Sequence, residues 1–121
     1  MTHRICFALL GLQLLALLVG TQMPEAWRSG IMHTTHAPPI MSSLGHFVLF
    51  AGMSMLLAMR PLVMPAWRIV LLALAVALLT EGLQFFAIDR HPRWIDVGID
   101  LTGAVLGVGL VKLAALCFAR A

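Results

Sequence analysis

The residues best suited to chemistry gather in one short stretch near the end of the chain, between two long apolar runs. Within residues 80–100 these are Glu81, Gln84, Arg90, Asp96 and Asp100. Carboxylates can exchange protons with a bound molecule, and an arginine beside them can neutralise a phosphate or another anion. Because no nucleophile motif accompanies them, the residue types allow either acid/base catalysis or ligand binding.

A histidine in an earlier apolar run is the sixth candidate. His46 lies in the segment SSLGHFVLF, and a histidine titrates close enough to neutral pH to exchange protons with Glu81 or with a substrate hydroxyl. A single histidine among apolar residues can equally be a packing residue that is satisfied inside the protein. Both roles stay open.

The composition indicates a membrane as the solvent. The chain has 121 residues, of which 61% are hydrophobic and 11% charged, whereas soluble domains are about half apolar and about a quarter charged. A chain of this length could not hide so much apolar surface from water. The formal charge is +3, but its basic residues are scattered singly at the ends of apolar runs. We therefore exclude a nucleic-acid partner and expect membrane lipids instead.

Four apolar segments are long enough to cross a bilayer as helices, which takes about 20 residues each. They are residues 5–21, 41–59, 67–88 and 94–118. The first resembles a signal peptide, but Pro24 and Glu25 suit processing badly, and we expect it to be retained. The prediction is an all-α, four-transmembrane-helix bundle that forms a single domain over residues 1–121.

The basic residues also predict an orientation. Positive charges favour the cytoplasmic side of a membrane, and five of the eight fall on one side of the predicted bundle: Arg4, Arg60, Arg68, Lys112 and Arg120. The other side carries Arg28, Arg90 and Arg93. We expect a multi-pass membrane protein with both termini in the cytoplasm.

Helix geometry brings the candidate residues to a similar depth. At about 1.5 Å per residue, Glu81 and Asp100 each lie about 10 Å below the outer ends of their spans, and His46 lies within about two turns. Small and polar residues also share faces: Ala73, Ala77, Glu81 and Gln84 on the third span, and Asp96, Asp100, Gly103 and Gly107 on the fourth. The last two match a small-xxx-small pattern that lets membrane helices approach closely. The sequence therefore predicts a polar pocket in the outer half of the bundle, with arginines as partners of the carboxylates.

These spacings resemble a known family. The pattern Glu81-x2-Gln84-x5-Arg90-x5-Asp96-x3-Asp100-x2-Gly103-x3-Gly107 is similar to the C-terminal signature of the VanZ-like membrane proteins, and His46-Phe47 resembles the family's His-aromatic motif. The sequence departs from the family's pattern in two places: Leu44-Gly45 stands where Asp-Lys is frequent, and Asp100 stands where Asn is frequent. The resemblance implies an envelope protein of the bacterial cytoplasmic (inner) membrane with a link to resistance against the glycopeptide teicoplanin.

Three functions fit these observations. The first is binding of an outer-leaflet ligand, such as a lipid-linked envelope precursor or a glycopeptide. The second is an intramembrane enzyme that acts on a phosphate-bearing substrate. The third is a proton-coupled transporter subunit, which with four spans would require a homo-oligomer. The polar set could also serve only as contacts that hold the helices together.

We predict neither a metal nor a cofactor. Met32, His33, His36 and Met41 include soft ligands that would suit copper, but the segment lacks a closed ligand set. Cys6 and Cys117 have no CxxC spacing, which makes them packing residues.

Overall fold

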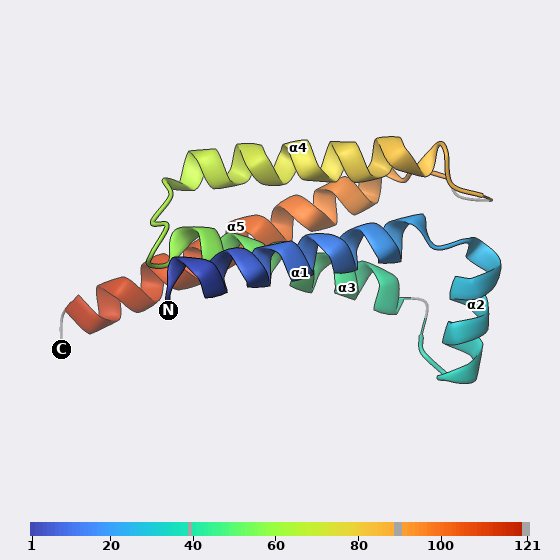
Figure 1. Ribbon diagram of the computed structural model, residues 1–121, viewed down its shortest axis with the longest axis horizontal. Helices are drawn as coiled ribbons and strands as arrows, with labels where there is room; N and C mark the ends of the chain where they lie inside the picture. Colours follow the sequence, from blue (N-terminus) through green and yellow to red (C-terminus); the bar gives the residue numbers. More distant parts are fainter. Residues whose placement is uncertain (39, 89–90, 120–121) are drawn as a thin grey trace.

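Four long helices and one short helix make up the described part of the chain. The structure is a computed structural model that describes residues 1–38, 40–88 and 91–119 (Figure 1). The long helices are α1 (His3–Gln22), α3 (Ile40–Ala58), α4 (Ala66–Gln84) and α5 (Trp94–Ala119), and the short one is α2 (Glu25–Thr34). All four long helices are apolar enough to span a membrane. The predicted all-α architecture with four spans is thus confirmed.

The ends of the helices differ from the prediction at two places. α4 ends at Gln84, four residues before the predicted limit of its span. The next amides, of Phe85 and Phe86, bond to carbonyls three residues back, at 3.3 and 3.0 Å, so the chain tightens into turns there. The connection between the first two spans contains α2, which begins after Pro24, a residue type that suits a helix start.

The closest packing in the molecule is between α3 and α5. A Cβ added to Gly103 would lie 2.5 Å from the carbonyl oxygen of Phe47, and one added to Gly107 would meet the carbonyl oxygen of Ala51. Side chains at these positions would overlap the backbone of α3, so glycine is required for the two helices to come this close. The predicted small-xxx-small contact is therefore present, and its partner is α3.

α1 and α4 complete the bundle, with α4 packed mainly against α5. The apolar core takes Leu17 from α1, Phe50 and Met53 from α3, and Ala73 and Ala77 from α4. α1 follows α3 along the bundle (Figure 1), and the Gln13 side chain lies against Gly52. Many large apolar side chains remain exposed on the outside of the bundle, which is where lipid would contact a membrane protein.

The two chain ends lie at the same end of the bundle, as four crossings require (Figure 1). α2 lies at the opposite end, turned away from the direction of the long helices (Figure 1). None of its residues is buried. The start of α3, the end of α4 and the start of α5 share the α2 end, so the predicted polar residues are close to it.

Candidate functional site

A buried histidine–aspartate pair connects α3 with α5. The Nδ1 atom of His46 lies 3.1 Å from Oδ1 of Asp100. Asp100 is fully buried and His46 is 8% exposed. When Asp100 is ionised its carboxylate only accepts hydrogen bonds, and Nδ1 of His46 is then the donor in this pair. The pair lies one turn from the Gly103 contact, so the same close approach of α3 and α5 brings the two side chains together.

A second polar group closes the end of α4. Oε2 of Glu81 accepts the backbone N–H of Arg93 at 2.7 Å, and Oε1 accepts Nε2 of Gln84 at 3.3 Å. Glu81 and Gln84 are both buried. Glu81 therefore fixes the chain where it turns back toward α5. This contact also explains why α4 ends earlier than predicted, because the loop must fold over its last turn to reach the carboxylate.

The sequence predicts arginines as partners of the buried carboxylates, and the structure describes one of them, Arg93. Arg93 contributes its backbone N–H while its side chain is exposed. The prediction for Arg90 lies outside the described residues. Asp96 lies in the first turn of α5, one turn before Asp100. Among the predicted residues that the structure describes, His46 and Asp100 form one contact, and Glu81 and Gln84 form another.

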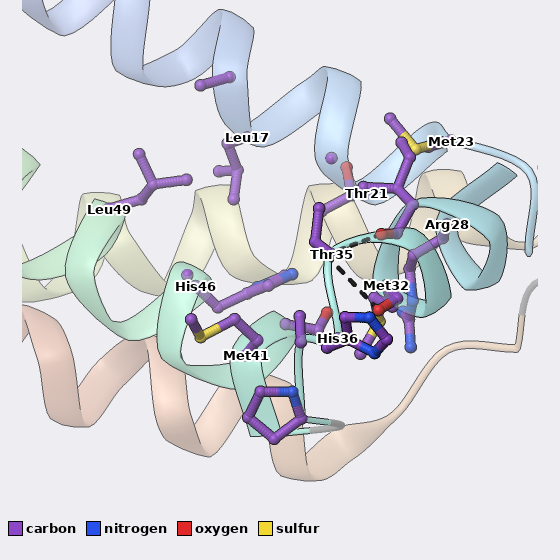
Figure 2. Close-up of a pocket in the computed structure, with 17 residues that line it drawn as sticks. Leu17, Thr21, Met23, Arg28, Met32, Thr35, His36, Met41, His46 and Leu49 are labelled. Atoms are coloured by element: carbon purple, nitrogen blue, oxygen red, sulfur yellow. Dashed lines mark hydrogen bonds between the residues drawn. The ribbon is translucent and has the colours of Figure 1, made fainter.

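A large cavity lies beside the His46–Asp100 pair, between α1, α2 and α3. Its volume is about 640 Å³, and His46 lines it while Asp100 does not. Most of its wall is apolar, and Leu17 of α1 and Leu49 of α3 both lie above His46 in the view of Figure 2. Such a combination of apolar walls and few polar groups is typical of sites for small molecules.

Glu81 faces a separate and much smaller space. That hollow is about 90 Å³ and lies between the end of α4 and the start of α5, beside Phe85, Pro92 and Trp94. Among the predicted residues that the structure describes, His46 lines the larger cavity and Glu81 lines the smaller one.

Several residues of the cavity wall were not among the predicted site residues. Thr21 comes from α1, Arg28 from α2, and His36 from the connection that follows α2. These residues belong to or adjoin the connection predicted for residues 22–40. A signal was present in the sequence, since Arg28 is a charged residue in the connection between two apolar spans, but its partners could not be assigned without the position of α2.

The segment considered for copper also contributes to this wall. Met32, His36 and Met41 line the cavity, whereas His33 does not. Among the described residues, no three His, Cys, Asp or Glu side chains are grouped closely enough to hold a metal ion. Both cysteines of the chain are free, with Cys6 buried and Cys117 exposed.

The fold and the site together define a class of protein. Four apolar helices of spanning length, with ionisable side chains buried between them near one end, are characteristic of a polytopic membrane protein with an intramembrane polar site. The chain belongs to the VanZ/LLP1 family, whose model matches residues 6–115. The resemblance noted in the sequence is thus confirmed over nearly the whole chain. No curated protein and no solved structure matches it.

Proposed function

We propose that this VanZ/LLP1 protein binds an amphiphilic molecule of the bacterial envelope in the cavity between α1, α2 and α3. The observation that carries the proposal is the cavity itself, because it joins a long apolar wall to His46, whose ring is held by Asp100. An apolar ligand segment would remove this wall from water, and a polar group would meet the imidazole. Ligand pockets have volumes of about 300–1,000 Å³, and this one is about 640 Å³.

The orientation that we propose places this cavity on the outer side of the cytoplasmic membrane. Arg4, Arg60 and Arg68 lie at the end of the bundle that holds the chain termini, and positive charges favour the cytoplasm. α2 and the cavity are then at the outer end. A lipid-linked envelope precursor in the outer leaflet, or a glycopeptide such as teicoplanin, would have access to it there.

Cys117 provides a test of that orientation. It is exposed and lies about 35 Å along α5 from Trp94, beyond a hydrocarbon core of about 30 Å. We expect a membrane-impermeant maleimide to label it in inverted membrane vesicles and not in intact spheroplasts. Cys6 is buried, and Cys117→Ser should remove the label. Labelling of Cys117 from the outside would reverse the orientation.

The binding itself is tested by filling the cavity. Gly20 and Gly45 line it, and a Cβ added to either meets no atom within 4 Å. Gly20→Leu and Gly45→Leu should therefore reduce the lipids that co-purify with the protein, as measured by mass spectrometry of the intact complex. Gly11→Leu is the matched control on α1, because Gly11 is equally open but does not line the cavity. An unchanged lipid complement in both cavity variants would contradict the proposal.

A role in teicoplanin resistance is tested separately, by measuring the susceptibility of cells. If teicoplanin is a ligand, cells that express the natural chain should differ in teicoplanin susceptibility from cells that express Gly20→Leu at the same level. Equal susceptibility would separate lipid binding from any role in resistance.

The second candidate function is an intramembrane enzyme, and the His46–Asp100 pair favours it. Asp100 would position the imidazole, which faces the cavity and could accept a proton from a bound hydroxyl or water. The test is turnover of a phosphate-bearing lipid by purified protein. Release of product by the natural chain, with loss of that release in His46→Gln, would favour the enzyme over the binding protein.

A further inference from the structure

We propose that the amphiphile in this cavity is a lipid with a phosphate at its polar end, and that Arg28 binds the phosphate. This inference rests on the proposed function, since it names the class of molecule that the same cavity would hold. It concerns a residue that lies outside the predicted polar group and on a different helix.

The sign of the charge around the cavity is the first argument. Every titratable side chain that lines it in the described part of the chain is basic: Arg28 on α2, His36 after α2, and His46 on α3. No aspartate or glutamate is among the described lining residues. The carboxylate of Asp100 contacts His46 but does not line the cavity. Arg28 always carries its positive charge, so the wall offers one cationic partner to an anion.

The state of the Arg28 side chain is the second argument. Its Nε atom is buried and has no hydrogen-bond partner among the described residues. The nearest carboxylate oxygen, Oε2 of Glu25, is 3.7 Å away, which is an ion pair at more than hydrogen-bond distance. A guanidinium can give two parallel hydrogen bonds to a phosphate. Arg28 thus retains donor capacity, although a ligand would compete with Glu25 for the same charge.

The positions of the polar and apolar groups give the third argument. Arg28 and His36 lie on the α2 side of the cavity, away from Leu17 and Leu49 on α1 and α3 (Figure 2). The hydroxyls of Thr21 and Thr35 donate to backbone carbonyls of their own segments, of Leu18 and Ile31. A molecule with an anionic end and an apolar end matches this separation, whereas inorganic phosphate would leave the apolar wall uncovered.

The experiment compares three probes in the same assay. Purified protein in a maltoside detergent, which contains no phosphate, is titrated with phosphatidic acid, with diacylglycerol of the same acyl chains, or with inorganic phosphate. Bound species are counted by non-denaturing mass spectrometry. We expect preferential binding of phosphatidic acid over diacylglycerol, and no displacement of it by equimolar inorganic phosphate.

Arg28→Gln should lower phosphatidic acid binding about tenfold, the equivalent of one charge-assisted hydrogen bond. Diacylglycerol binding should not change, which also shows that the variant is folded. Arg28→Lys should keep part of the preference, because a lysine retains the charge without the planar fork. Arg68→Gln is the control, because Arg68 is exposed and lies over the ring of Trp67, a residue that does not line the cavity.

The failures of the two proposals are distinguishable. Equal binding of both lipids that is lost in Gly20→Leu would overturn the phosphate inference and leave the proposed function in place. Lipid binding that Gly20→Leu does not reduce would overturn both. Displacement of phosphatidic acid by equimolar inorganic phosphate would show an anion site without a lipid, and would also overturn the inference.

Discussion

The two sides of α3 are built in opposite ways. On one side, α5 is close enough for its glycines to contact the carbonyl groups of Phe47 and Ala51. On the other side, α1 and α2 leave a cavity of about 640 Å³. His46 belongs to both sides, since its ring is bonded to Asp100 and also lines the cavity. The contact with α5 therefore positions the His46 ring, and the other side of α3 exposes that ring to the cavity.

The largest effect should come from forcing the packed side apart. Gly107→Leu places a side chain where the Ala51 carbonyl lies, so α3 and α5 must separate. We expect a loss of stability toward the upper part of the range for overpacking, about 1–3 kcal/mol. The measurement is the thermal unfolding midpoint in detergent. Gly109→Leu on the same helix meets no atom within 4 Å and should keep the midpoint. A similar decrease of the midpoint in both variants would show that the close contact between α3 and α5 does not determine the stability.

Removal of one member of the buried pair should have the next largest effect. His46→Ala leaves the Asp100 carboxylate buried without its partner. Polar contacts between membrane helices contribute about 0.6 kcal/mol on average and up to about 1.7 kcal/mol, and we expect a value near the upper end. Asp100→Asn should cost less, because an amide oxygen can still accept from Nδ1. The double variant should lose less than the sum of the two, and strict additivity would show that the two side chains do not interact.

The buried pair shows which contacts can be predicted from the sequence alone. The fixed rise of a helix predicts His46 and Asp100 at a similar depth, and its period predicts that Asp100 shares a face with Gly103 and Gly107. The same geometry predicted the glycine contact on α5. It could not predict α2 or the role of Arg28, because a cavity depends on how three helices are set relative to one another. The pattern does not predict the early end of α4, because the Arg93 backbone N–H donates to the Glu81 carboxylate across a loop whose path the sequence does not reveal.

Glu81 should have a smaller effect than the pair, because it holds a loop at the end of the bundle. Glu81→Ala removes the acceptor of both the Arg93 amide and the Gln84 side chain. We expect a loss of about 1 kcal/mol in the free energy of unfolding. Gln84→Ala removes only one of these bonds and should cost about half as much. Hydrogen exchange at the Arg93 amide should be faster in Glu81→Ala and little changed in Gln84→Ala. An Arg93 amide that stays protected in both variants would contradict this role.

The smallest effect should come from a glycine on the open side of α3. A Cβ at Gly52 would meet only the end of the Gln13 side chain, at 2.6 Å from Nε2. This flexible group can move, and alanine favours a helix over glycine by about 1 kcal/mol. Gly52→Ala should therefore be neutral or slightly stabilising in thermal unfolding, whereas Gly107→Ala should be destabilising. Equal losses in the two alanine variants would remove the distinction between the two sides.

The pairing of α3 with α5 has a consequence for the biosynthesis of the protein. His46 and Asp100 are 54 residues apart in the chain, and α4 is made between them. When α3 leaves the ribosome, its closest neighbour does not yet exist. The nascent chain must therefore hold an unpaired histidine in the bilayer, or delay the release of α3 from the insertion machinery, until the last helix arrives.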